Sequence, residues 1–133
     1  MIRYAPVFCP VLGAAVLAAL SACAEGEPPQ DPALIEAGRQ VFGACAACHS
    51  TQMGGGHKAG PNLYGVAGTP AAQAAGYDYS VALASSGLVW DDATLHAYLA
   101  DPTGTVEGGK MIYAGLEDEA DRDAVIAYLK SKR

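Results

Sequence analysis

Apolar residues recur at helical spacing in the segment that begins at residue 32. One face of this segment carries Leu34, Gly38, Val41 and Phe42. Asp31 precedes Pro32, so a residue that caps helix N-termini stands before a proline at the first helical position. The pattern predicts a first helix from Pro32 to about Gly43.

A second amphipathic pattern closes the chain, from Asp118 to Lys132. Acidic residues come early and basic residues late, an order that complements the helix dipole. One side of the segment is apolar and carries Ala124, Val125, Tyr128 and Leu129. We predict a C-terminal helix here.

Between these segments the pattern predicts only short helices. Tyr79–Ser86, followed by a glycine, predicts one of them. Asp91 and Asp92 introduce another, Ala93–Ala100, which Pro102 stops. No segment alternates apolar and polar residues over five positions, and no internal repeat is present. The expected fold class is therefore all-α.

The segment from His49 to Gly76 is expected to form a long ordered loop. Glycine or proline interrupts it every few positions, at Gly54, Gly55, Gly56, Gly60, Pro61, Gly65, Gly68 and Pro70. Loops of this length are uncommon in compact domains and are usually functional. Something other than a protein core is expected to hold this loop in place.

The N-terminus has the layout of a secretory signal. Arg3 is followed by an uncharged, mostly apolar stretch that runs to Ala24. The stretch ends in Leu20-Ser21-Ala22-Cys23, which resembles the lipobox of bacterial lipoproteins, in which cleavage leaves the cysteine first and its thiol carries a lipid. Two alternatives remain open: ordinary cleavage after Ala24, and an uncleaved membrane span.

The chain therefore divides into three parts. Residues 1–22 are expected to form a lipoprotein-type signal peptide, and residues 23–33 an acidic, proline-rich tether anchored by lipid on Cys23. Residues 34–133 are expected to form one folded domain, because 133 residues suffice for a single compact domain.

Composition and charge exclude some classes of partner. The 14 acidic side chains outnumber the 8 basic ones and give a net charge of −6, which argues against a nucleic-acid surface. The 16 glycines and 8 prolines fit short helices joined by ordered loops better than a helical bundle. We expect a monomer.

The chemistry is concentrated in the motif CAACH, residues 45–49. The thiols of Cys45 and Cys48 have the spacing that adds across the two vinyl groups of a haem, and the adjacent His49 then lies under the iron. A zinc site would need a second ligand pair, and a thioredoxin-like redox pair would need a βαβ context. The motif therefore predicts one covalently bound haem c.

A haem also explains the long loop, because its apolar faces can replace a protein core. The sixth iron ligand is then to be found among Met53, His57, His96 and Met111, besides the lysines and water. Met53 and His57 are close to His49 in sequence and would have to reach the opposite haem face. Met111 follows Gly108-Gly109-Lys110, where glycines let the backbone approach a flat ring.

From Gly38 onward the sequence resembles the class I cytochromes c, especially the mitochondrial and alphaproteobacterial branch. The matching motifs follow the family's order over about 95 residues. They are CAACH (45–49), GHKAGPNL (56–63), GYDY (76–79), Trp90, Thr94–Leu99 with Tyr98, GKMIYAG (109–115) and IAYLK (126–130). The resemblance implies a class I cytochrome c fold of short helices and long loops around one haem.

The resemblance also implies roles for individual residues. His49 and Met111 would be the axial ligands, and the Pro61 carbonyl would accept a hydrogen bond from the His49 ring. Tyr98 would lie beside the Met111 sulfur, and Tyr79 and Trp90 would donate to a haem propionate. His57 would tie the loop, and His96 is expected to be a helix-surface residue. Gly38 would be the point where the first and last helices cross, near Val125 and Tyr128.

The chain departs from the mitochondrial pattern at several positions. Thr69 and Leu83 stand where an Arg and an Asn lie near the propionates, and Gly109 replaces the Thr before Lys-Met. Most lysines of the ring around the haem edge are missing, with Ala44, Thr103 and Gly104 in such positions and only Lys58 and Lys110 retained. These departures affect the choice of partner and leave the haem prediction intact.

We therefore predict a single-haem electron carrier rather than an enzyme. Its donor and acceptor would be redox proteins, in the same membrane to which lipid on Cys23 anchors the carrier on the periplasmic side of a bacterial cell. The alternatives for location are a soluble periplasmic protein and one anchored by an uncleaved span. The alternatives for function are an exported haem module that binds a gas or peroxide when Met111 is displaced, and a thiol oxidoreductase that uses Cys45 and Cys48.

Overall fold

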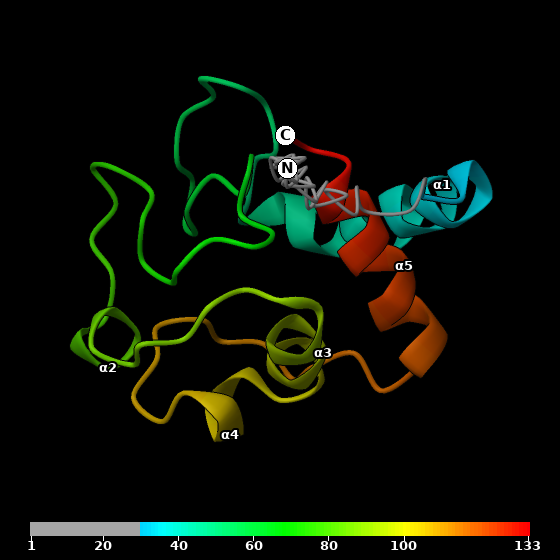
Figure 1. The fold of residues 1–133 in the computed structure, drawn as a ribbon. Helices are drawn as coiled ribbons and strands as arrows, with labels where there is room; N and C mark the ends of the chain where they lie inside the picture. Colours follow the sequence, from blue (N-terminus) through cyan, green and yellow to red (C-terminus); the bar gives the residue numbers. More distant parts are fainter. Residues whose placement is uncertain (1–29) are drawn as a thin grey trace, which may run out of the picture.

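The structure is a computed structural model that describes residues 30–133, and it consists of short helices joined by long loops (Figure 1). The expected signal peptide, Cys23 and most of the tether lie outside the described residues. The helices are α1 (Pro32–Val41), the 3₁₀ helix η1 (Phe42–Ala47), α2 (Val81–Ala84), α3 (Asp92–Ala100), α4 (Pro102–Thr105) and α5 (Glu119–Lys130). Residues 30–133 contain no strand, only an isolated antiparallel bridge between Pro70 and Val89. The predicted all-α class is confirmed.

Side-chain caps determine where the helices begin. The Asp31 carboxylate accepts a hydrogen bond from the backbone N–H of Ala33 at 2.9 Å, and Asp118 caps α5 in the same way through Ala120. Asp91 caps α3 through Thr94. The predicted helix starts at Pro32 and near Asp118 are confirmed.

The structure corrects the end of the first helix and adds a helix that was not predicted. The first helix was expected to end near Gly43, but α1 ends at Val41 and the chain continues as a 3₁₀ helix to Ala47. Pro102 ends α3 as predicted and also begins the unpredicted α4, because a proline suits a first helical turn and the Asp101 carboxylate caps that turn through the N–H of Gly104.

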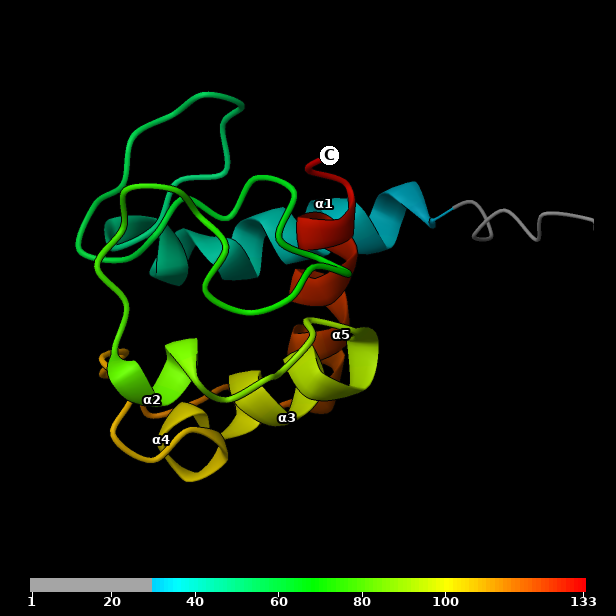
Figure 2. The same ribbon diagram turned by 60° about the vertical axis from the view of Figure 1, so that its left-hand side comes forward.

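The first and last helices cross at Gly38, as predicted (Figure 2). A Cβ atom on Gly38 would lie 1.9 Å from the Ala124 carbonyl oxygen and 2.9 Å from the Tyr128 Cβ. Tyr128 was an expected neighbour, and the nearest backbone atoms belong to Ala124, directly before the expected Val125. The crossing buries Ala124–Leu129 of α5 and also packs Phe42 against the Tyr128 ring, with centroids 5.1 Å apart.

The long loop contains no regular element, as predicted. Residues 49–76 lie with α1 and η1 on one side of the molecule, and α2, α3 and α4 lie on the other side in both views (Figures 1 and 2). The buried side chains of Leu95 and Leu99 on α3 and Val125 and Leu129 on α5 belong to one hydrophobic cluster. This cluster forms the wall of a central cavity that both sides of the molecule line.

Candidate cofactor site

The cavity has a volume of about 490 Å³ and a mostly apolar lining. This volume lies within the range of about 300–1,000 Å³ that is usual for small-molecule and cofactor sites. The cavity brings together all eight residues named from the sequence as cofactor-binding: Cys45, Cys48, His49, Pro61, Tyr79, Trp90, Tyr98 and Met111. They come from η1 and the residue that caps it, the long loop, the segments on either side of α2, α3, and the segment between α4 and α5.

The 3₁₀ helix presents the CAACH motif to the cavity. The backbone N–H groups of Cys48 and His49 both donate to the Cys45 carbonyl, at 3.0 and 2.9 Å, so the three side chains belong to one tight turn. Burial raises the pKa of the Cys45 thiol, and the neighbouring Cys48 adds to this effect. Neither Cys45 nor Cys48 forms a disulfide, so both sulfurs can form thioether bonds.

His49 is held in one tautomer. Its Nδ1 lies 2.8 Å from the Pro61 carbonyl oxygen, which is the contact that the resemblance implied. A carbonyl only accepts, so Nδ1 carries the proton and Nε2 keeps its lone pair for a metal. Burial lowers the pKa of His49, while the Pro61 contact raises it and Lys58 lowers it. The net effect favours the neutral imidazole that metals bind.

Gly60 lets the loop close directly over the imidazole. A Cβ at this position would lie 2.3 Å from Cε1 of His49 and 2.7 Å from each ring nitrogen. Any side chain would therefore displace the ring. The Gly60 N–H also donates to the Cys48 carbonyl at 2.8 Å, which ties this part of the loop to the CAACH turn.

Aromatic side chains line the cavity away from His49. Trp90 is 7% exposed, and its ring meets the Tyr98 ring edge to face with centroids 4.9 Å apart. The Tyr79 hydroxyl accepts a hydrogen bond from the N–H of Ala74 at 3.2 Å. Burial raises the pKa of both Tyr79 and Tyr98. Both phenols therefore stay protonated at neutral pH and can donate hydrogen bonds into the cavity.

Among Met53, His57, His96 and Met111, only Met111 lines the cavity. Lys110 also lines it, but its amine is paired with Asp78. Met53 is 75% exposed. His57 uses both ring nitrogens within the loop, since Nδ1 accepts from the N–H of Asn62 at 3.0 Å and Nε2 lies 2.9 Å from the Ala75 carbonyl. His57 thus ties the loop, as the resemblance implied.

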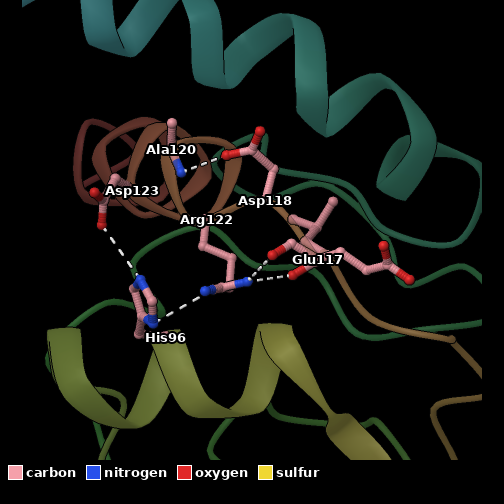
Figure 3. Close-up of polar contacts among 7 residues, drawn as sticks. His96, Glu117, Asp118, Ala120, Arg122 and Asp123 are labelled. Atoms are coloured by element: carbon pink, nitrogen blue, oxygen red, sulfur yellow. Dashed lines mark hydrogen bonds and ion pairs between the residues drawn. The ribbon is translucent and has the colours of Figure 1, made fainter.

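His96 corrects a prediction, because it is not a simple surface residue. Its side chain is 29% exposed and lies between α3 and α5, facing Arg122 and Asp123 (Figure 3). Nothing in the local sequence signals this contact, since the partners are 26 and 27 positions away and meet only when the two helices pack.

The side chains at the positions that depart from the mitochondrial pattern bond to nearby residues or line the cavity, and the two retained lysines have partners within the protein. The Thr69 hydroxyl donates to the Val66 carbonyl at 2.8 Å, and Leu83 adds an apolar side chain to the lining. Lys110 forms an ion pair with Asp78 at 2.6 Å, and Lys58 donates to the Ala46 carbonyl at 2.5 Å. Both lysines retained from the expected ring are thus engaged within the protein.

The donor set and the shape of the cavity fit a covalently bound haem. Two thiols and a neutral imidazole share one turn, a glycine leaves room for the imidazole, and the rest of the lining is largely apolar. The fold and this site define a class of protein, a small all-α domain built around one c-type haem.

The comparisons place the chain within this class. The cytochrome c family profile matches residues 35–133. The chain is 53% identical over 91 residues to cytochrome c2 iso-2 of Magnetospirillum fulvum, covering 68% of this chain and 94% of that protein. It is 40% identical over 104 residues to cytochrome c of Ginkgo biloba, covering 77% and 89%. The structure of cytochrome cH from Methylobacterium extorquens matches with a TM-score of 0.70 and 44% identity, over 74% of this chain and 98% of that chain.

The chain therefore belongs to the cytochrome c family. It carries one haem c, attached through Cys45 and Cys48 of the CAACH motif that also contains His49. It is an electron carrier that exchanges electrons with redox partners, and it is not an enzyme. This excludes a thiol oxidoreductase that uses Cys45 and Cys48, because both sulfurs are committed to the haem.

Proposed function

We propose that the carrier works with His49 and Met111 as the two axial ligands of its haem. The observation that carries this proposal is that Met111 lines the same cavity as His49, while Met53, His57 and His96 lie elsewhere or have other partners. The haem supplies a one-electron Fe(III)/Fe(II) couple. With both axial positions filled by the protein, no substrate reaches the metal.

The aromatic residues have supporting roles in this proposal. Tyr79 and Trp90 act as neutral donors to a haem propionate, and Tyr98 lies beside the Met111 sulfur. Their burial in the cavity and the protonated phenols support these roles.

A ligand-binding spectrum of the reduced protein tests the proposed ligation by His49 and Met111 against the gas-binding or peroxide-binding alternative. A closed site leaves the spectrum unchanged on addition of carbon monoxide, whereas a displaced Met111 gives a new Soret band.

We also propose that the protein acts on the periplasmic side of a bacterial membrane, anchored by lipid on Cys23. The lipobox-like LSAC sequence and the acidic, proline-rich tether support this proposal. Within residues 30–133, no helix is long and apolar enough to cross a membrane. The donor and acceptor are then redox proteins of the same membrane, which tethering keeps at a high effective concentration.

Cys23→Ser is expected to move the cytochrome from the membrane fraction to the soluble fraction. Two or more acyl chains hold a protein stably on a membrane, and the variant has no thiol to carry them. Cell fractionation followed by mass spectrometry of the N-terminus measures the effect, with Cys9→Ser as the matched control because Cys9 lies within the cleaved signal. A membrane-bound protein that retains Met1 would instead identify an uncleaved span.

Electron transfer to a partner with an acidic docking face is expected to be slow and nearly independent of added salt. Removing residues 1–22 takes away Arg3, one of the 8 basic side chains, and none of the 14 acidic ones, which leaves a net charge of −7. The two retained lysines are already engaged with Asp78 and Ala46. Beside Met111, Ile112 is fully exposed, so the available docking surface there is apolar rather than cationic.

The second-order rate constant of the domain without its tether, measured across a salt series, checks this prediction. Screening acts over a Debye length of about 10 Å at 0.1 M salt, so an attraction carried by lysines would weaken steeply as salt rises. Asp78→Ala removes the carboxylate paired with Lys110 and leaves only the contact of Lys110 with the backbone carbonyl of residue 78, so a weak salt dependence is expected in this comparison. A steep fall in the rate of the unaltered domain would contradict the prediction.

A further inference from the structure

His96 connects α3 and α5, the two helices to which Leu116 is hydrogen-bonded in the segment after Met111. Its Nδ1 lies 3.3 Å from Nε of Arg122, and its Nε2 lies 3.5 Å from a carboxylate oxygen of Asp123 (Figure 3). The guanidinium N–H can only donate, so Nδ1 is the acceptor and the ring proton lies on Nε2, facing Asp123. His96 on α3 therefore accepts a hydrogen bond from Arg122 of α5 through Nδ1 and faces Asp123 of the same helix through Nε2.

Arg122 in turn holds the chain that leads from Met111 to α5. Its Nη1 donates to the carbonyl oxygens of Leu116 and Glu117, at 2.5 and 2.8 Å. The backbone N–H of Leu116 donates to the Leu99 carbonyl at 2.8 Å, which attaches the same chain to α3. Just before it, Gly115 packs so closely that a Cβ would lie 2.0 Å from the Ala100 carbonyl oxygen.

Protonation of His96 conflicts with this arrangement. An imidazolium has N–H groups on both nitrogens, so Nδ1 no longer accepts from Arg122 and two positive groups face each other. The attraction to Asp123 increases at the same time. These two residues are the charged groups of α5 that face the imidazole. One turn earlier on α3, Asp92 pairs with Lys130 at 2.8 Å, and the segment at 116–117 presents backbone carbonyls to Arg122.

We propose that His96 is a positioning residue for the segment from Met111 to Glu117, here called the ligand segment. Its protonation weakens the hydrogen bonds of Arg122 to the carbonyls of residues 116–117. When His96 is neutral, Arg122 is fixed between the imidazole and the two carbonyls, and the segment from Met111 to Glu117 is closed. When His96 is protonated, Arg122 is pushed away and the segment opens more often. Any effect of this opening on the iron rests on the proposal that Met111 is a ligand. The opening of the segment itself does not depend on that proposal.

The test is amide hydrogen exchange at Leu116 in the reduced, haem-loaded protein, because this N–H reports the contact with Leu99 directly. After correction for intrinsic exchange, the protection of Leu116 is expected to fall about fivefold between about pH 8 and pH 5.5. A histidine changes charge in this window, and the size of the fall corresponds to the loss of one hydrogen bond. His96→Gln keeps a neutral acceptor at this position and is expected to show a flat profile over the same range.

Two further variants make the outcome decisive. His57→Gln removes the other histidine outside the CAACH motif and is expected to leave the Leu116 profile unchanged. Asp123→Asn removes the exposed carboxylate that attracts the imidazolium and keeps Arg122, so it is expected to retain the pH-dependent fall in Leu116 protection. The proposal is overturned if the unaltered protein gives a flat profile, if His96→Gln gives the same slope, or if Asp123→Asn abolishes the fall.

One more variant, Met111→Ala, separates this proposal from the proposal that Met111 is an iron ligand. Met111→Ala removes the proposed ligand and leaves His96, Arg122 and Leu116 untouched, so its Leu116 profile is expected to keep the pH dependence. An unchanged iron–sulfur band in Met111→Ala would refute Met111 as ligand. A missing pH dependence in the unaltered protein would refute His96 as the positioning residue.

Discussion

Met111→Ala is expected to abolish the weak Fe(III)–sulfur charge-transfer band and to lower the reduction potential by on the order of 100 mV or more. A thioether is a soft ligand that favours Fe(II), so its loss stabilises Fe(III). The alanine also leaves a position open beside the metal, and exogenous ligands are then expected to bind. Visible spectroscopy of the oxidised protein and a potentiometric titration measure the two effects.

Met53→Ala is the matched control for this substitution. Met53 is 75% exposed and does not line the cavity, so both the band and the potential are expected to remain as in the unaltered protein. A Met111→Ala protein with the original band and potential would contradict the proposed ligand set. Loss of both signals in Met53→Ala would move the assignment to that residue.

Gly38→Ala is expected to destabilise the fold by about 3 kcal/mol, because overpacking at a tight contact costs more than the gain in helix propensity. The new Cβ would lie 1.9 Å from the Ala124 carbonyl oxygen, so α1 and α5 would have to separate by more than about 1 Å. For a domain of about 100 residues this loss lowers the melting temperature by about 12–20 °C. Thermal and denaturant unfolding of the haem-loaded protein measure it.

Gly43→Ala provides the control for this effect. A Cβ on Gly43 meets nothing within 4 Å, so the same chemical change is expected to alter the free energy of unfolding by less than about 0.5 kcal/mol. Equal losses in the two variants would show that the cost comes from replacing a helical glycine by alanine and not from the crossing of α1 with α5.

Local sequence signals account for most of the helical elements. The starts of α1, α3 and α5 follow Asp31, Asp91 and Asp118, whose carboxylates cap the adjacent turns. These signals act within three or four residues, so they are visible in the sequence. The end of α1 and the extra turn at Pro102 were less predictable, because the choice between α and 3₁₀ geometry or a further turn depends on packing.

The cofactor could also be predicted from the sequence, because CAACH places the thiols and the imidazole within five consecutive residues. The other cavity residues followed from the resemblance and not from any local rule. Pro61 illustrates the limit: its carbonyl is common to every residue type, and only the folded loop brings it to 2.8 Å from His49. The same holds for Gly60, whose small size matters because of where His49 lies.

By itself the sequence determined the helix starts, the covalent haem and the acidic charge balance, because each depends on neighbours along the chain or on composition. Only the tertiary structure decided which side chains share the cavity, that Lys110 is paired with Asp78, and that His96 lies between Arg122 and Asp123. These partners are separated by 26 to 32 positions. Contacts over such distances depend on how α3, α5 and the ligand segment pack, and no local pattern specifies that packing.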